Sequence, residues 1–374
     1  MEKVFIVTNM STHYRTKLFE ELARRLNVHF YFFSMGGEGY WNQKNKLIFG
    51  EYPYTQMDTR TFLKSFRSAI AKDKPSVIVK CMNGRIPLPY TFLLAKLRRI
   101  PFVLWTGMWD HPHTFFHKLS YPLSKFIYKR ADAIVVYGDH VKRYLVEQGI
   151  DEKKIFCAWQ TVDNAKFNRP VSEEEVAQMR TEYGLPNKKV ILYVGRFVED
   201  KGLEYLIEAF GKSKHKDDAV LTLVGNGAYE PKLRELAEQA GIEMQIIPHV
   251  PNDQLYKFYK LAYLFVLPSV TTATFKEPWG LVVNEAMNQG TPVISTDSVG
   301  AAVGGLMAHG ETGFVVPERN GDALAEAIDQ LLGDEGLRER MSAAAKREIE
   351  RWTYPRMADG FTDAIAYAKG KGAR

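Results

Sequence analysis

Two cationic side chains follow an apolar, strand-like segment in the second half of the chain. After residues 190–194 come Gly195 and Arg196, and Lys201 stands five residues beyond Arg196, directly before Gly202. When a diphosphate leaves a sugar, negative charge collects on the phosphates, and an Arg and a Lys at a strand end can stabilise that charge without a metal ion. Both cations are expected at the surface of a ligand cleft. The same spacing is equally typical of a solvent-facing loop before a helix.

Two carboxylates stand eight residues apart across the expected start of a helix. Glu277 is followed by Pro278 and Gly280, which suit a helix entry, and Glu285 lies one or two turns into the helix. The N–H groups at such a start can bind phosphate. Glu277 can then meet sugar hydroxyls and Glu285 a ribose. Two exposed acids on an ordinary helix are the alternative.

The two motifs occurring together resemble glycosyltransferase family 4. The similarity covers about residues 190–317, and its further elements are Gly225-Asn226-Gly227, Val250-Pro251, Pro268-Ser269, 290–294 and 313–317. This resemblance implies an α/β fold of the GT-B type, with two Rossmann-like domains facing a central cleft. It also implies a retaining transfer without a bound metal, and the chain contains no Asp-x-Asp pair.

By that resemblance, individual residues take the roles of a donor site. Arg196 and Lys201 would hold the donor diphosphate, and Glu277 the sugar hydroxyls. Main-chain N–H groups of Gly280 and Leu281 would bind sugar or phosphate. Glu285 would bind the ribose, and the base would lie near His249 and Val250. The expected donor-binding set is Gly195, Arg196, Lys201, Gly225, His249, Val250, Glu277, Gly280, Leu281 and Glu285, and the expected catalytic set is Arg196, Lys201, Glu277 and His111.

The chain departs from the family pattern in three places. Residues 270–276 intervene between the Pro-Ser pair and Glu277, which leaves the sugar specificity open. The first strand is followed by 9–15 instead of a glycine pair. Many family members carry a His after the strand that corresponds to 102–106, where His111 and Asp110 are the candidates, although a His in a polar loop is more often a surface residue. The acceptor-side candidates are His13, Arg15, Asp110 and His111.

Apolar strand-like runs alternate with amphipathic helical patterns along the whole chain, which is typical of parallel sheets covered by helices. Two such sheets in tandem predict ligands at the carboxyl ends of the strands, in a cleft between the domains. The expected strands are 4–8, 28–33, 76–82, 102–106, 133–137 and 155–159, then 190–194, 220–224, 245–247, 264–267, 292–295 and 313–316.

The expected domains are an acceptor-binding domain over 1–165 and a donor-binding domain over 166–352. The stretch between 161–163 and Lys189, with a polar helix at 172–183, is expected to be the linker. A last helix over 353–374 could pack on either domain. The long loop 35–55, rich in glycine and aromatic residues, is expected to be mobile.

Composition sets the protein class. Of 374 residues, 45% are hydrophobic and 25% are charged, as in soluble globular proteins, and no apolar run is long enough to span a membrane. The N-terminus does not read as a signal peptide, which predicts a cytoplasmic protein. Cys81 and Cys157 are expected to be buried thiols.

Charge is distributed unevenly between the two halves. Residues 1–165 carry 25 Lys and Arg against 14 Asp and Glu, a charge of +11, whereas 166–374 carry 25 against 30, a charge of −5. A basic half suggests an anionic partner such as phosphate, anionic lipid or nucleic acid; a solvated basic face is the alternative. The aromatic, basic segment 121–130 would suit a membrane surface, but a helix packing its aromatics on the sheet is favoured.

These observations favour a retaining glycosyltransferase. It would move a sugar from a nucleoside-diphosphate donor, with UDP the expected nucleotide and no cofactor, to a sugar or lipid-linked acceptor. Peripheral association with an anionic membrane is a further expectation, and no nucleic-acid partner is expected. The alternatives are a sugar-nucleotide epimerase or hydrolase of the same architecture, and a non-catalytic nucleotide or nucleic-acid binder. A dinucleotide-dependent dehydrogenase is disfavoured because no strand is followed by Gly-x-Gly-x-x-Gly.

Overall fold

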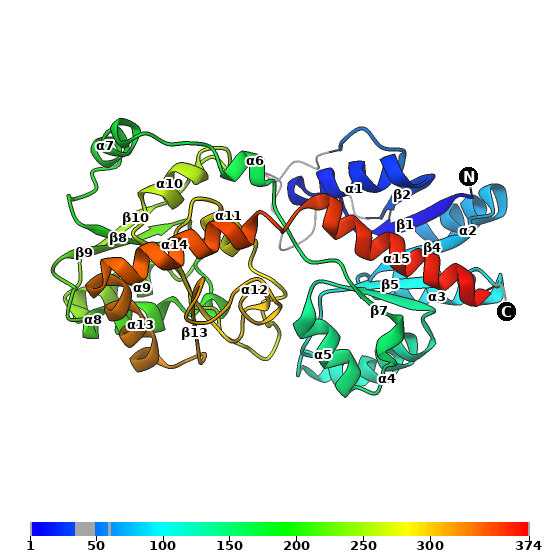
Figure 1. Ribbon diagram of the computed structural model, residues 1–374. Coiled ribbons are helices and arrows are strands. Elements are labelled where there is room, and N and C mark those ends of the chain that lie inside the picture. Colours follow the sequence, from blue (N-terminus) through cyan, green and yellow to red (C-terminus); the bar gives the residue numbers. More distant parts are fainter. Residues whose placement is uncertain (1, 34–48, 59–60, 373–374) are drawn as a thin grey trace. The chain divides into compact units, whose positions relative to one another are not determined.

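The computed structural model describes residues 2–33, 49–58 and 61–372, so most of the loop expected to be mobile lies outside the described residues. The chain forms two compact units (Figure 1). Unit 1 contains the described residues of 1–111, 115–160 and 353–374, and unit 2 contains 112–114 and 161–352. In the described parts of the chain, no helix is both long and apolar enough to cross a membrane.

Unit 1 is built on a sheet of seven parallel strands in the order β3-β2-β1-β4-β5-β6-β7. Its central strands are continuous apolar runs because both faces of the sheet are covered by helices. The edge strand β3 was not predicted, since its three residues are all exposed and show no apolar pattern. The strands are β1 (Val4–Thr8), β2 (Val28–Phe32), β3 (Tyr54–Gln56), β4 (Val77–Cys81), β5 (Phe102–Thr106), β6 (Ala133–Val136) and β7 (Ile155–Cys157).

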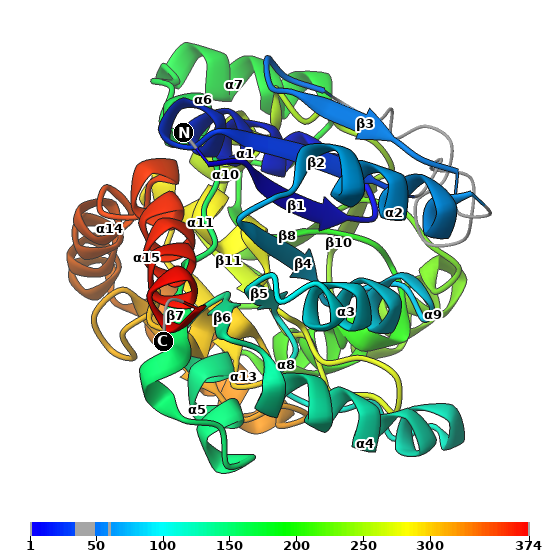
Figure 2. The same cartoon turned by 90° about the vertical axis from the view of Figure 1, so that its right-hand side faces the viewer.

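Two sets of helices enclose this sheet (Figure 2). On one face, α1 (His13–Arg25) and α15 (Tyr354–Gly372) share an apolar core with the strands. On the other, α2 (Phe62–Asp73), α3 (Pro87–Leu97), α4 (Phe115–Arg130) and α5 (Asp139–Glu147) form a second core. The last helix therefore belongs to unit 1. It packs so closely that a Cβ on Gly360 would lie 2.2 Å from the carbonyl oxygen of Cys157.

Two expectations about unit 1 side chains need correction. In the segment 121–130, Tyr128 and Ile127 are buried as the favoured interpretation predicts, but Phe126 is 50% exposed because it lies on the outer face of α4. Cys81 is buried on β4, whereas Cys157, on β7 next to the edge of the unit, is only partly buried.

Unit 2 contains six parallel strands in the order β10-β9-β8-β11-β12-β13. The direction in which the strands are added reverses between β8 and β11, and ligands of such sheets bind at the carboxyl ends of the strands at that point. The strands are β8 (Lys189–Val194), β9 (Ala219–Val224), β10 (Met244–Ile247), β11 (Leu264–Leu267), β12 (Val293–Thr296) and β13 (Gly313–Val316). The helices are α8 (Leu203–Lys212), α9 (Glu230–Ala240), α10 (Leu255–Leu261), α11 (Leu281–Asn288), α12 (Gly300–Val303), α13 (Gly321–Gly333) and α14 (Glu335–Ile349).

The expected linker is wrong, because this stretch folds into unit 2. It forms α6 (Asn164–Phe167), which packs on α11, and α7 (Glu173–Glu182), which packs on α10. The Asn164 side-chain amide donates to the carbonyl oxygens of Ile349 (3.0 Å) and Trp352 (2.9 Å), and the Thr161 hydroxyl also donates to Trp352 (2.6 Å). These bonds join the first and last segments of unit 2 and involve residues almost 200 positions apart, which a local pattern does not reveal.

Candidate active site

The loop after β8 is held by the loop after β9. The N–H of Gly195 donates to Val224 (3.0 Å), and the N–H of Phe197 donates to Asn226 (2.9 Å). Gly225 has φ 142°, and a Cβ there would lie 1.9 Å from the carbonyl oxygen of Gly195. A side chain at 225 would thus push the two loops apart. The glycine expected to bind the donor has a structural function: it allows the backbone carrying Arg196 to approach β9.

The same loop is also fixed against the loop after β11. Gly202 has φ 60°, and a Cβ there would lie 2.3 Å from the carbonyl oxygen of Pro268. The N–H of Val270 donates to Asp200 at 3.0 Å. The segments after β8 and β11 therefore meet at the reversal point of the sheet, where a ligand site is expected.

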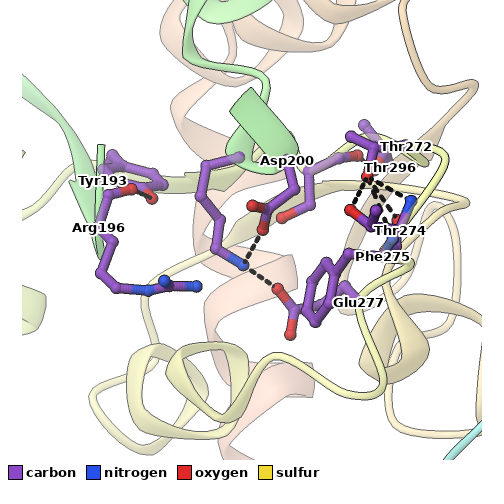
Figure 3. Close-up of polar contacts among 10 residues, drawn as sticks. Tyr193, Arg196, Asp200, Thr272, Thr274, Phe275, Glu277 and Thr296 are labelled. Atoms are coloured by element: carbon purple, nitrogen blue, oxygen red, sulfur yellow. Dashed lines mark hydrogen bonds and ion pairs between the residues drawn. The ribbon is translucent and has the colours of Figure 1, made fainter. Parts of the chain in front are cut away.

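Lys201 lies at the centre of this junction. It is only 8% exposed, so it is more buried than a residue at the surface of a cleft was expected to be. Its Nζ pairs with the carboxylate of Glu277 and lies 3.3 Å from Asp200, and it stands 5.2 Å from the centre of the Phe275 ring. Figure 3 shows the carboxylates of Asp200 and Glu277 in this cluster and Arg196 extending toward it from the β8 side. A buried cation needs such partners because desolvation of an isolated charge is costly.

Glu277 lies outside the strands of the sheet and is positioned by an isolated backbone bridge. It forms a parallel bridge with Val299, and its carbonyl accepts from the N–H of Gly300 at 3.1 Å. Two residues on, the buried indole N–H of Trp279 donates to Asn284 on α11 (2.8 Å). The backbone at Glu277 is therefore fixed relative to both the start of α12 (Gly300–Val303) and α11.

Helix α11 begins at Leu281, with Gly280 as its N-cap at φ 92°. The first N–H groups of a helix have no acceptor within it, and Gly280 has no side chain to cap them. A side chain at this position would also meet Leu267, since a Cβ would lie 2.7 Å from its Cδ2. The helix start is thus a potential anion site beside Glu277.

The inserted segment 270–276 is an ordered part of the site. Residues Thr272 to Phe275 form a turn closed by a 2.9 Å backbone hydrogen bond (Figure 3). The Thr271 hydroxyl donates to Glu318 at 2.7 Å, and Arg319 donates to the carbonyl oxygen of Thr271 at 2.6 Å. The loop after β13 therefore holds the insertion, which places the Phe275 ring against Lys201.

Glu285 is buried on α11, away from the Lys201 cluster. The hydroxyl of Tyr259 on α10 donates to its carboxylate at 2.7 Å. Burial raises the pKa of Glu285 to about 7, while the bond from Tyr259 and the charge of Lys166 lower it in part. Neither partner was predicted, because both lie on other helices. Burial also lowers the pKa of Lys166.

The residues expected near the base lie after β10. His249 is exposed and Val250 is buried. The Asn226 amide donates to the carbonyl oxygen of Pro248 at 3.0 Å, so the loop after β9 positions the residue before His249.

The four acceptor-side candidates of unit 1 do not share one position. Arg15 donates to the hydroxyl of Tyr137 at 3.0 Å, and its guanidinium lies 4.6 Å from the Trp105 ring. His13 is exposed at the start of α1. His111 and Asp110 lie in the loop after β5, where the His111 imidazole hydrogen-bonds the carbonyl oxygen of His117 (2.7 Å).

Sequence reasoning missed a buried lysine in unit 1. Lys80 on β4 is fully buried, and its Nζ donates to the carbonyl of Cys81 (2.6 Å) and to the carbonyl and side chain of Asn83 (2.8 Å each). The Asn83 amide donates in turn to Asn9 after β1 (2.9 Å). Burial lowers the pKa of Lys80 to about 7. This polar network lies where the strand order of the first sheet reverses, between β1 and β4.

The arrangement in unit 2 combines cations, fixed carboxylates and an uncapped helix start around one strand reversal. Such groups suit a ligand that carries both phosphates and hydroxyls. Within 2–33, 49–58 and 61–372, no group of three His, Cys, Asp or Glu side chains is arranged to hold a metal ion.

Comparisons with known proteins agree with this chemistry. Residues 176–348 match the family model of glycosyl transferases group 1, and residues 14–166 match that of glycosyltransferase family 4. Together the two matches include most of the chain.

Two curated relatives align with about two thirds of the chain. The D-inositol 3-phosphate glycosyltransferase of Corynebacterium urealyticum is 31% identical over 286 residues, which are 68% of this chain and 65% of that protein. The alpha-D-kanosaminyltransferase of Streptomyces kanamyceticus is 27% identical over 267 residues, 68% of this chain and 67% of that protein. The chain thus spans about two thirds of the length of these relatives.

Solved structures show the same fold over almost the full length. A glycosyltransferase from Rickettsia africae superposes with a TM-score of 0.76 at 20% identity, covering 98% of both chains. HepE of Anabaena, in complex with UDP, superposes with a TM-score of 0.78 at 16% identity, covering 98% of this chain and all of that one. With two α/β units, each built on a parallel sheet, the chain has the GT-B fold and belongs to glycosyltransferase family 4.

Proposed function

We propose that the protein is a retaining glycosyltransferase that transfers a sugar from a UDP-sugar to a sugar or lipid-linked acceptor, without a metal ion. The observation that supports this most is the junction of Lys201 with Glu277 where the strand order of unit 2 reverses. It places a cation for phosphates and a carboxylate for sugar hydroxyls within one ion pair.

Each group has a task in such a transfer. Cleavage of the bond between the anomeric carbon and the phosphate oxygen leaves negative charge on the diphosphate. Arg196, Lys201 and the N–H groups at the start of α11 stabilise that charge. Glu277 accepts hydrogen bonds from the sugar hydroxyls, and its ion pair with Lys201 holds the carboxylate in place. Glu285 accepts from the ribose hydroxyls.

The choice of UDP is supported by the structural neighbour HepE, which was solved with UDP and with UDP-glucose. Family membership supports the proposed retaining course, and the two cations at the proposed phosphate site support a transfer without a metal ion. A cytoplasmic location belongs to the same proposal, because nucleotide sugars are its substrates.

A test begins with the binding of UDP, GDP and ADP by calorimetry, with turnover then measured on the sugar donor of the preferred nucleotide. Arg196→Ala should lower turnover about a hundred- to a thousand-fold, as expected for the loss of one preorganised donor to the leaving group. Arg347→Ala, which removes an exposed cation of α14, is the matched control. Near-normal turnover of the Arg196 variant at saturating donor would remove this residue from the mechanism.

Product analysis separates the enzyme classes. The anomeric configuration of the product, read by NMR, should match that of the donor. Conversion of the donor at the same rate without any acceptor would instead indicate an epimerase or a hydrolase.

A further inference from the structure

A row of large apolar side chains is exposed on two neighbouring helices of unit 1. On α4, Leu119, Leu123 and Phe126 follow one another at spacings of four and three residues, which places them on one face. On α3 and the residue before it, Ile86, Leu93 and Leu97 follow at spacings of seven and four residues, which also places them on one face. All six side chains are between 48% and 71% exposed.

The helices that carry the two rows are neighbours, and we call their six exposed apolar residues together the α3–α4 face. The helices lie side by side in Figure 2, and a groove between them is lined by Leu88 from α3 and by Leu119 and Leu123 from α4. The ring centroids of Phe92 on α3 and Phe126 on α4 lie 6.0 Å apart. A surface patch of this kind usually marks an interaction site.

The charge around the α3–α4 face is almost entirely positive. Residues 85–130 contain eight Lys and Arg and a single acid, Asp110, and of these cations Lys96 is paired with Asp132 (2.7 Å). On α4, Lys118, Lys125 and Lys129 form a second row about a quarter turn from the apolar one, at about 100° per residue. Arg98 and Arg99 are exposed at the end of α3. Lysines beside an apolar face can lay their stems along it and extend their ammonium groups into a polar layer.

We propose that the α3–α4 face docks unit 1 on the surface of an anionic lipid bilayer. The apolar rows would enter the boundary between headgroups and acyl chains, and the lysine row would meet the phosphodiester groups. An apolar face flanked by cations is the pattern of interfacial helices. A soluble protein partner would have to be acidic and apolar at once to match this face, whereas an anionic bilayer combines both properties.

Vesicle sedimentation tests this directly. We expect the protein to pellet with vesicles of phosphatidylglycerol and phosphatidylcholine in roughly equal parts, and much less with phosphatidylcholine alone. Each cation near an anionic surface contributes about fivefold to partitioning, so the triple variant Lys118→Gln, Lys125→Gln, Lys129→Gln should bind on the order of a hundredfold more weakly. Raising salt should release the protein as well, since the Debye length falls from about 10 Å at 0.1 M to about 3 Å at 1 M.

The control is a variant with the same change in charge on another unit. Arg340→Gln, Lys346→Gln, Arg347→Gln removes three exposed cations of α14 and should reduce binding by less than the fivefold of a single surface charge. An equal loss in both triple variants would show that only net charge acts, and would overturn the assignment of the face.

The apolar rows are tested by Leu119→Ser with Leu123→Ser, with folding checked by thermal denaturation. Loss of two exposed leucines should leave the melting temperature nearly unchanged and weaken vesicle binding by about tenfold or more. Binding equal to that of the unmodified protein would refute insertion of the face. A dimer that sedimentation velocity detects in the unmodified protein, and that this variant dissolves, would make a second copy the occupant instead. Vesicle binding is measured without donor, so its failure would leave the proposed transferase activity standing.

Discussion

The buried carboxyl of Glu285 allows a test of the donor site through stability alone. Burial raises its pKa from 4.5 to about 7. Between pH 4.5 and about pH 7, the folded chain therefore keeps a proton on Glu285 that the unfolded chain has already released. Since the folded state binds more protons there, its stability falls as pH rises through this window and is constant with respect to this group above and below it. The difference in pKa corresponds to a loss of about 3 kcal/mol in the free energy of unfolding.

Glu285→Gln removes this titration. As the pH rises from 5 to 8, the free energy of unfolding of the variant minus that of the unmodified protein should increase by most of about 3 kcal/mol. The unfolding of both proteins in urea is measured at several pH values with a spectroscopic signal from unit 2. Only the difference between the two curves is interpreted, because all other titrations are common to both. Tyr259→Phe is the matched control: it removes the hydrogen bond that lowers the pKa, so the midpoint should move to higher pH.

The same carboxyl predicts the pH dependence of nucleotide binding. If the ribose hydroxyls donate to the ionised form, UDP affinity of the unmodified protein should decline as pH falls below about 7. In Glu285→Gln it should be lower throughout and independent of pH in this range. Stability curves that run parallel from pH 5 to pH 8 would refute the assigned burial and its consequence for the ribose site.

Three other predictions concern the loops and the charge at the site. In urea denaturation, Gly225→Ala should lower the free energy of unfolding by more than about 2 kcal/mol, because its Cβ would meet the carbonyl oxygen of Gly195. Gly241→Ala, with open space around its Cβ, should lower it by only about 1 kcal/mol. Similar losses in the two variants would contradict the close approach of the two loops at Gly225. Lys201→Met removes the cation shared by Asp200 and Glu277 and should lower the free energy of unfolding by about 3 kcal/mol or more. Adding Glu277→Gln should restore part of this stability. A loss below about 1 kcal/mol for Lys201→Met alone would indicate an ion pair in contact with solvent. Turnover should survive treatment with a chelator, and its loss with rescue by magnesium or manganese would contradict the proposed role of the cations.

Much of the fold could be predicted from local patterns. Strands buried on both faces are continuous apolar runs, so β11 was predicted at its observed residues and β9 within one residue. The candidate residues Arg196 and Lys201 follow such a strand, and Glu277 stands before an expected helix start, so all three could be proposed from residue type and spacing. The edge strand β3 could not, since none of its residues is buried.

Only the tertiary structure decided how these residues interact. The ion pair of Lys201 and Glu277 joins positions 76 residues apart, and the partner of Glu285 lies on another helix. Burial and pKa depend on every element packed around a side chain, which a local pattern does not contain. The sequence by itself therefore determined the buried strands, the family resemblance and the candidate residues. The packing of distant segments determined that Lys201 is buried, that Gly225 has no room for a side chain, and that Glu285 titrates near neutral pH.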